Sequence, residues 1–302
     1  MTPLVSAVVL NWRNAPDTIS CLASLSRQSY PHHVIVVDNA SQDDSVRRIR
    51  AAYPDVEILE TTANLGYAGG NNAGIRYALG QGADYVFVVN NDATLAPTCL
   101  GELIDAALRY PQVGVVGGTI YDAGEPKRIQ SAGMLVTPMG DGIHRGEGDV
   151  DRGQYRDVEE VDAVKGCAML VSRAAVEAAG MLDERYYMYR EEVDWCQRIR
   201  RAGFIILYAP RASIWHPETP PGKDRYVRAT YYMTRNGYLL LKSMQAPPTA
   251  FLRVLARDLI WAANWTLNPK WRHKRRERDA LILALRDAAL GKWGCAPRWH
   301  HG

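Results

Sequence analysis

Residues 85–97, with the sequence YVFVVNNDATLAP, place an apolar run directly before two asparagines and an aspartate. Such a run is typical of a buried β-strand, and Pro97 suits the first turn of a following helix. Asn90, Asn91 and Asp92 do not suit a strand interior, because a carboxylate removed from water without a partner costs free energy. We interpret these three residues as the polar end of a buried strand.

Short β-rich runs alternate with longer helical patterns through the first half of the chain, as in a parallel sheet joined by crossover helices. The predicted strands are residues 4–10, 34–38, 56–60, 85–90 and 113–117. The predicted helices are residues 17–28, 43–53, 71–80 and 97–110. Ser41 is the expected N-cap of the second helix. This alternation predicts an α/β, Rossmann-like doubly wound fold.

The second half of the chain has a different pattern. Residues 122–160 are rich in Gly, Asp and Arg and predict hairpins or mobile loops. Ordered elements are expected at 161–171, 173–179, 190–202 and 204–208, followed by helices from 225 to about 290. We expect a catalytic domain at 1–245, with a nucleotide-binding half at 1–120 and an acceptor half at 121–245, and a basic helical extension at 246–302.

Polar side chains end three of the predicted strands. Asn11 and Asp38 follow the first two, in the same way that Asn90 to Asp92 follow the fourth. Each of them alone could cap a turn, as Asn and Asp often do. Because ligands of open parallel sheets bind at the carboxyl ends of the strands, three such ends together indicate the rim of one crevice.

The crevice lacks the glycine-rich loops that cradle phosphates. Residues 10–16, LNWRNAP, contain no glycine where a dinucleotide-binding loop would need several, and a P-loop is absent. A diphosphate bound there would need another counter-charge, for which a divalent cation held by oxygen ligands is usual. Asp92 is the carboxylate placed to hold that cation.

A second acidic cluster lies in the predicted helix 190–202. Glu191, Glu192 and Asp194 crowd its first turn, above an apolar stripe that includes Val193 and Ile199. The helix dipole favours acids at this end, which explains one or two of them structurally. Three acids within one turn repel one another, and such repulsion raises a carboxyl pKa toward the range of a general base.

The bulk properties are those of an ordinary globular protein, with 47% hydrophobic and 23% charged residues among 302. A formal net charge of +3 is too small to indicate nucleic acid as a partner. The five cysteines are scattered and never form C-x-x-C, so we expect reduced thiols in the cytoplasm. We see no signal-peptide pattern and no apolar run of about eighteen residues.

Over roughly residues 4–245 the chain resembles the inverting family 2 glycosyltransferases of the GT-A fold, particularly the bacterial rhamnosyltransferase-like members. The resemblance rests on the order and spacing of VVLNWRN, VIVVDNASQDDS, NLGYAGGNNAGI, VFVVNNDATL, GCAMLVSR, MYREEVDWCQRIRRAG and SIWHP. It implies a mixed sheet and a donor that is a nucleoside diphosphate sugar.

The resemblance also implies roles for individual positions. The residues implied to bind the donor are Asn11, Trp12, Asp38, Asn64, Gly66, Asn71, Asn90 and Asn91. Within this set Asp38 matches the acid that binds the nucleotide base, while Trp12 is equally typical of packing. Asp92 and His216 match the positions that hold Mg²⁺ or Mn²⁺.

The acidic helix matches the part of the family that carries the catalytic base. Glu192 falls on the base position, and Glu191 is the alternative because the family usually has the shorter Asp there. Asp194 belongs to the same acidic cluster, and Trp195, Arg198 and Arg200 match a segment that faces the acceptor or leaving group. The segment NND keeps only one carboxylate at the metal position.

The implied reaction is transfer of a sugar from dTDP-rhamnose or a UDP-hexose to a hydroxyl of a glycan or lipid-linked glycan, with inversion, in cell-wall or polysaccharide biosynthesis. Two alternatives stay open. A glycoside hydrolase would use two carboxylates about 5–9 Å apart and neither nucleotide nor metal. A catalytically silent protein of the same fold would bind the nucleotide sugar without turnover.

The helical extension carries Trp261 and Trp265 among leucines in residues 251–267, followed by the basic run KWRHKRRER at 270–278. Aromatic and basic residues on an amphipathic helix are typical of peripheral contact with an anionic membrane, here on its inner face. A helix that packs on the catalytic domain with a solvated basic face is the alternative interpretation.

Overall fold

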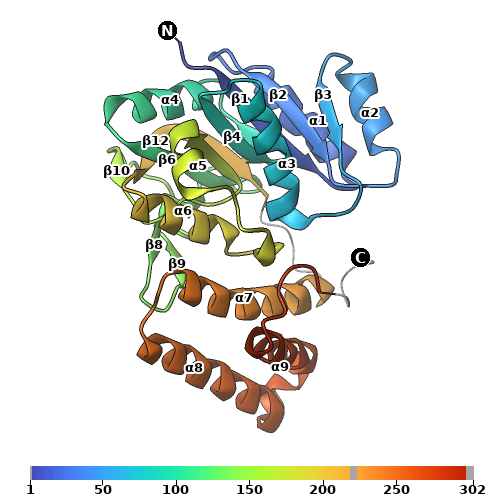
Figure 1. The fold of residues 1–302 in the computed structure, drawn as a ribbon, viewed down its shortest axis with the longest axis vertical. Coiled ribbons are helices and arrows are strands. Elements are labelled where there is room, and N and C mark those ends of the chain that lie inside the picture. Colours follow the sequence, from blue (N-terminus) through green and yellow to red (C-terminus); the bar gives the residue numbers. More distant parts are fainter. Residues whose placement is uncertain (1, 218–222, 297–302) are drawn as a thin grey trace.

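The computed structural model describes residues 2–217 and 223–296 of the chain (Figure 1). Its centre is a ten-stranded sheet with the order β10-β12-β6-β11-β4-β1-β2-β3, in which β5 also pairs with β12 and β7 with β6. The strands are β1 (Val5–Asn11), β2 (His33–Asp38), β3 (Glu57–Glu60), β4 (Tyr85–Asn90), β5 (Thr94–Leu95), β6 (Val113–Asp122), β7 (Ile129–Ser131), β10 (Glu159–Glu160), β11 (Ala168–Ser172) and β12 (Ile205–His216). A separate hairpin contains β8 (Met134–Val136) and β9 (Gly142–His144).

Helices surround this sheet and form a further layer beside it. They are α1 (Ala15–Leu25), α2 (Ser45–Ala52), α3 (Gly66–Gly80), α4 (Cys99–Arg109), α5 (Arg173–Ala179), α6 (Glu191–Arg201), α7 (Lys223–Ser243), α8 (Pro248–Leu267) and α9 (Arg275–Ala289), with short 3₁₀ turns η1 (Glu184–Tyr186) and η2 (Pro269–Lys274). In the described part of the chain, none of the helices combines the length and apolar composition that spanning a membrane requires.

The sheet is mixed, which confirms the predicted α/β class. Strands β3, β2, β1 and β4 are parallel, whereas β11 runs antiparallel to both β4 and β6. Successive strand residues point to opposite faces, so Val8 packs into the cluster that includes Ile75 of α3 while Val9 packs with Leu22 of α1. Burial on both faces explains why these strands are apolar throughout.

Several predicted boundaries are corrected by the structure, including those of β6, which runs to Asp122 rather than to residue 117, and β11, which begins at Ala168 rather than at residue 161. Helix α2 begins at Ser45 with Asp44 at its N-cap, because the predicted cap Ser41 instead donates its hydroxyl to Asp38 Oδ1. Helix α3 begins at Gly66 rather than at residue 71. Strand β12 continues to His216, because its last residues pair with β6 up to Asp122. Residues 122–160 were predicted to form hairpins or mobile loops, and the structure shows hairpins and short strands there.

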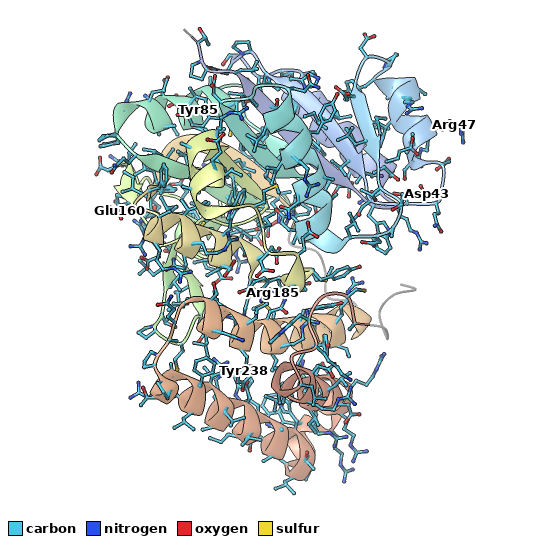
Figure 2. The ribbon with its side chains drawn as sticks, in the orientation of Figure 1. Asp43, Arg47, Tyr85, Glu160, Arg185 and Tyr238 are labelled. Carbon is cyan, nitrogen blue, oxygen red and sulfur yellow. The ribbon has the colours of Figure 1, made fainter. Side chains whose placement is uncertain are left out.

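Helices α7, α8 and α9 form a layer below the sheet in Figure 1. Arg235 of α7 is buried and donates to the backbone oxygen of Tyr186 at 3.2 Å. Asn236 donates to the backbone oxygens of Met188 and Tyr189. Tyr238, labelled in Figure 2, joins α7 to α8 through a 2.9 Å hydrogen bond to Asp258. The layer thus holds the segment that enters α6.

Candidate functional site

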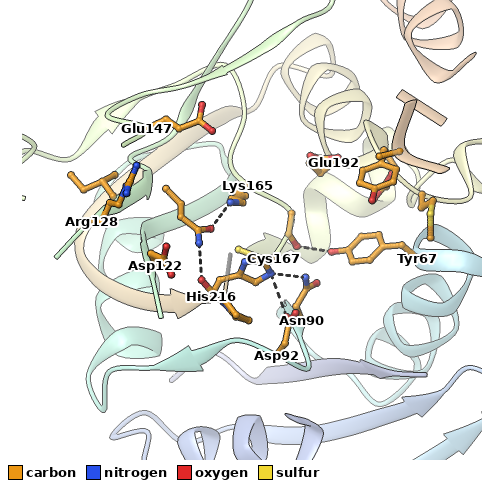
Figure 3. Close-up of a pocket in the computed structure, with 18 of the residues that line it drawn as sticks. Tyr67, Asn90, Asp92, Asp122, Arg128, Glu147, Lys165, Cys167, Glu192 and His216 are labelled. Carbon is orange, nitrogen blue, oxygen red and sulfur yellow. Dashed lines mark hydrogen bonds and ion pairs between the residues drawn. The ribbon is translucent and has the colours of Figure 1, made fainter. Parts of the chain in front are cut away.

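An open cavity of about 990 Å³ lies beyond the carboxyl ends of β4 and β12 and beside the first turn of α6 (Figure 3). This volume is at the upper end of the range usual for small-molecule sites. The side chains that line it include Tyr67, Asn90, Asp92, Asp122, Arg128, Gln130, Glu147, Lys165, Cys167, Glu191, Glu192, His216 and Tyr226. The cavity therefore brings the predicted metal pair together with Glu191 and Glu192, two of the three predicted catalytic acids.

Asp92 and His216 form one wall of the cavity. Strand β12 runs antiparallel to β5, and this pairing brings His216 Nε2 to 3.3 Å from Asp92 Oδ1. Asn90 Nδ2 lies 3.4 Å from the same ring nitrogen. Both side chains are mostly withdrawn from water, at 25% exposure for Asp92 and 14% for His216. A histidine nitrogen and a carboxylate so close together can share one cation.

Asp92 and His216 fit a cation whose remaining ligands come from the substrate and from water. Within residues 2–217 and 223–296, no group of three or more His, Cys, Asp and Glu side chains is arranged to hold a metal ion. Mg²⁺ is usually held by one or two carboxylates, substrate phosphates and water rather than by an all-protein cage. Asp92 and His216 match that partial protein contribution.

Glu191 and Glu192 begin α6 on another part of the cavity wall. Burial raises the pKa of Glu191 well above its ordinary value, and the neighbouring charge of Glu192 raises it further. Burial also raises the pKa of Glu192, but backbone N–H groups of the helix start and the cations Arg190 and Lys165 oppose that rise. Burial therefore raises the pKa of both carboxyls, and only that of Glu192 is opposed by nearby cations.

Arg190, directly before these acids, has a backbone conformation that few side chains adopt, with φ of +73°. Its guanidinium donates to the oxygen of Gly140 at 2.6 Å and lies 3.3 Å from Asp141 Oδ1. Arg257 of α8 contacts the same carboxylate at 3.0 Å. The start of α6 is therefore held by the β8–β9 hairpin, whose Asp141 is in turn paired with α8.

A buried polar network joins the ends of β1, β2 and β4. Asn11 donates to Asp38 Oδ1 at 2.7 Å, and Thr18 donates to the amide oxygen of Asn11 at 2.7 Å. Asn91 in turn donates to the Thr18 hydroxyl at 3.0 Å. Asn11 and Asp38 are almost completely buried. The three polar strand ends predicted to share one crevice do meet, as a hydrogen-bonded cluster.

The model of the family described as glycosyl transferase family 2 matches residues 6–178. The chain belongs to glycosyl transferase family 2.

The glycosyltransferase is 32% identical over 237 residues to N-acetylglucosaminyl-diphospho-decaprenol L-rhamnosyltransferase of Mycobacterium tuberculosis, covering 72% of this chain and 76% of that protein. It is 30% identical over 230 residues to galactofuranosyltransferase GlfT1 of Mycobacterium tuberculosis, covering 72% and 71%. The solved mannosyltransferase of Pyrobaculum calidifontis, in complex with GDP-Man and Mn²⁺, superposes with a TM-score of 0.56 at 18% identity, over 97% of this chain and 88% of that one. This likeness confirms the GT-A fold.

The predicted donor residues of the glycosyltransferase occupy different surroundings. Asn90 lines the cavity, whereas Asn11, Asp38 and Asn91 belong to the buried network beside it. Half-buried Trp12 lies under the guanidinium of Arg13, at 5.1 Å from the ring centre.

A second polar cluster surrounds the start of α3. Asn64 accepts the Gly66 N–H at 2.9 Å and also the side-chain amide of Asn39. Asn39 is buried and was missed in the sequence, although it directly follows Asp38 in the motif VIVVDNASQDDS. Asn71 is buried on the next turn and donates to the oxygen of Tyr67. These contacts order the loop before α3 and the first turn of that helix, where Tyr67 lines the cavity.

The later residues of α6 pack away from the cavity. Asp194 is fully buried and pairs with Arg198 at 2.7 Å. Trp195 is fully buried, and its indole N–H donates to the oxygen of Gly180 at 2.7 Å. Arg200 pairs with Asp162 at 2.6 Å. None of these four residues is part of the cavity lining, so their observed contacts hold α6 in place.

The structure adds cavity residues that the sequence did not single out. Tyr67 donates to the oxygen of Gly166 at 2.5 Å. Lys165 donates to Gln130 Oε1 at 2.6 Å, and Gln130 donates to the oxygen of His216 at 2.7 Å. No periodic pattern or spacing links these three segments, so only their contact in the fold reveals them.

Proposed function

We propose that this glycosyltransferase moves a sugar from a nucleoside diphosphate sugar to an acceptor hydroxyl with inversion, using Glu192 as the base. The observation that carries the proposal is the shared cavity, which has the Asp92–His216 pair on one part of its wall and the paired glutamates on another. This separation suits a reaction in which the leaving group and the attacking oxygen lie on opposite sides of the anomeric carbon.

The two glutamates have different proposed roles. Burial and the charge of Glu192 raise the pKa of Glu191 well above its ordinary value, so we assign the protonated role to Glu191. Arg190 and Lys165 favour the ionised form of Glu192, which accepts the proton of the acceptor hydroxyl as that oxygen attacks. A protonated Glu191 removes the repulsion that would otherwise hinder ionisation of its neighbour.

Asp92 and His216 would hold Mg²⁺ or Mn²⁺ together with oxygens of the donor diphosphate. When bound, the cation would supply Lewis-acid stabilisation of the charge on the departing nucleoside diphosphate. The structural neighbour solved with GDP-Man and Mn²⁺ supports this assignment.

The curated relatives support a choice of substrates. We propose dTDP-rhamnose as the donor, with a UDP-hexose as the alternative, because one relative is named a rhamnosyltransferase and another a galactofuranosyltransferase. The name of the first also supports a sugar on a lipid diphosphate as the acceptor.

A lipid-linked acceptor would place the enzyme at a membrane, and α8 offers a surface for that contact. One face of α8 packs inward through Val254 and Asp258. Its other face exposes Leu252, Leu255, Leu259, Ile260 and Leu267, and Trp261 is exposed near its C-terminal end. Exposed basic residues lie nearby at Arg253, Lys270, Arg272 and Arg275. Apolar and basic side chains together suit the headgroup layer of an anionic bilayer, so we propose peripheral binding there.

The function is tested by incubating the protein with dTDP-rhamnose or UDP-hexoses and a lipid diphosphate-linked N-acetylglucosamine. We expect a glycosylated product of inverted anomeric configuration by NMR, formation that stops with EDTA, and loss of product in Glu192→Gln. Glu147→Gln is the matched control, because Glu147 is an exposed acid of the same cavity. Metal-independent cleavage of sugars would indicate a hydrolase, and nucleotide binding without turnover would indicate a silent binder.

The membrane contact is tested by flotation with vesicles that contain phosphatidylglycerol. We expect the protein to float and the variant Leu252→Ser/Leu255→Ser/Leu259→Ser to stay in the soluble fraction. Leu108→Ser on α4 is the control, because Leu108 is also exposed. Equal flotation of both variants would contradict the proposed surface.

A further inference from the structure

Lys165 is a cation at the cavity that contacts no carboxylate among the described side chains, although its charge acts on nearby Glu192. It lies in the loop between β10 and β11, lines the cavity and is partly buried. Its ammonium donates to Gln130 Oε1 at 2.6 Å, and none of the ion pairs among the described side chains, those of residues 2–217 and 226–296, includes it. A cation withdrawn from water beside a neutral amide is favourably placed for an anionic ligand.

The position of Lys165 is held from two sides. Gln130 contacts Lys165 through its oxygen and donates its N–H to the backbone oxygen of His216 at 2.7 Å. On the other side, Tyr67 donates to the oxygen of Gly166 at 2.5 Å. In Figure 3, Lys165 lies between His216 and Glu192. The ammonium is thus fixed between the proposed metal ligands and the proposed base.

We propose that Lys165 binds the diphosphate of the donor and balances the charge that develops on the departing nucleoside diphosphate. This inference rests on the proposed function, because it assumes that the cavity receives such a donor. A lysine is a compact point charge that suits phosphate oxygens. Asp92 is the one carboxylate proposed to hold the cation. The ammonium of Lys165 would be a second positive charge beside that cation, and the two would together stabilise the leaving group.

Arg128 is less suited to this role, although it also lines the cavity. Its guanidinium lies 3.4 Å from Glu125 Oε1, and 45% of its side chain is exposed. A solvated cation with a carboxylate partner has less to gain from a phosphate than Lys165 has.

The test is calorimetric titration of UDP and dTDP into the protein and its Lys165→Met variant, each with Mg²⁺ and with EDTA. We expect the variant to bind the nucleoside diphosphate about 10- to 100-fold more weakly under both conditions, as loss of a charged hydrogen bond implies. Uridine and thymidine, which lack phosphate, should bind both proteins equally. Lys165→Arg should recover part of the affinity, and Lys127→Met controls for removal of an exposed positive charge near the cavity.

The outcomes separate this inference from the proposed function. Equal affinity of the wild type and Lys165→Met for UDP and dTDP would overturn the inference, while sugar transfer by the wild type would leave the proposed function standing. A variant that binds nucleotide normally and changes only the acceptor KM or the pH profile would likewise overturn it, because Lys165 would then act on the acceptor or on Glu192. Unfolding temperatures of both Lys165 variants check that each is folded, and loss of folding in Lys165→Met leaves Lys165→Arg for the same titration. The inference is supported if Lys165→Arg binds the nucleoside as tightly as the wild type does but binds the nucleoside diphosphate more weakly.

Discussion

His216 Nε2 lies 3.3 Å from Asp92 Oδ1, although one residue ends β12 and the other follows β4. Strand β5 connects them, because Thr94 pairs with Trp215, directly before His216. On the other side, the backbone oxygen of His216 accepts a hydrogen bond from the side-chain amide of Gln130. The distance between the two side chains is therefore set by the sheet rather than by a flexible loop.

Substitution of Asp92 by Asn should abolish the metal dependence of transfer. The amide keeps the shape of the side chain but removes the charge that would hold the cation beside His216. We expect the transfer rate to fall about 100-fold or more, because stabilisation of the leaving group is lost. Initial rates over a Mn²⁺ titration measure this effect. A variant with the metal response of the wild type would remove Asp92 from the site.

Glu192→Gln should lower kcat by about 100- to 10,000-fold, as expected for loss of a general base. Glu192→Asp, which has the shorter acid usual in the family, should retain more activity. Because burial raises the pKa of Glu192, the rate of the wild type should fall as the pH drops through that raised pKa, above the ordinary 4.5. The pH profile of kcat/KM measures this limb, and its persistence in Glu192→Gln would assign the base elsewhere.

Glu191→Gln should stabilise the fold at higher pH. Burial raises the folded-state pKa of Glu191, so the folded state binds more protons than the unfolded state at intermediate pH, and stability falls as the pH rises through that range. A glutamine, which resembles the protonated acid, does not incur this loss. The gain in unfolding temperature over the wild type should be small near about pH 4 and larger near about pH 8. A gain that does not change with pH would contradict the assignment.

Gly66→Ala should destabilise the protein more than Gly82→Ala does. Both glycines have positive φ angles, of +71° and +89°, so both substitutions carry a strain of about 1 kcal/mol or more. A Cβ atom at Gly66 would also lie 2.4 Å from the oxygen of Tyr187, whereas one at Gly82 would meet nothing within 4 Å. Urea unfolding of both variants measures the difference, and equal free energies of unfolding would show that the loop of Tyr187 moves freely.

Much of the fold could be predicted because its signals are local. Apolar runs such as 34–38 and 85–90 are strands, and the acids of α6 stand at the helix start where the dipole favours them. Ser41 shows where this reasoning fails. Its hydroxyl can cap a helix, but in the fold it is within reach of the buried Asp38 carboxylate, which competes for it.

The site was predictable only in part, because some of its contacts join segments that are distant in the sequence. Asp92 and His216 are predicted metal ligands and Glu191 and Glu192 are predicted catalytic acids, and all four line one cavity. Trp195 and Arg198 share their motif, but the helical period turns them toward Gly180 and Asp194. A motif records which residues are neighbours in the chain, and the helix decides which of them face the cavity.

The sequence by itself determined the class of the sheet, the polar ends of its strands and the acidic start of α6, because each depends on residues within a few positions of one another. Only the tertiary structure decided that Lys165, Gln130 and His216 form one chain of contacts, and that burial raises the pKa of both Glu191 and Glu192. Those properties depend on burial and on charges that distant segments bring to the same place, which no local pattern contains.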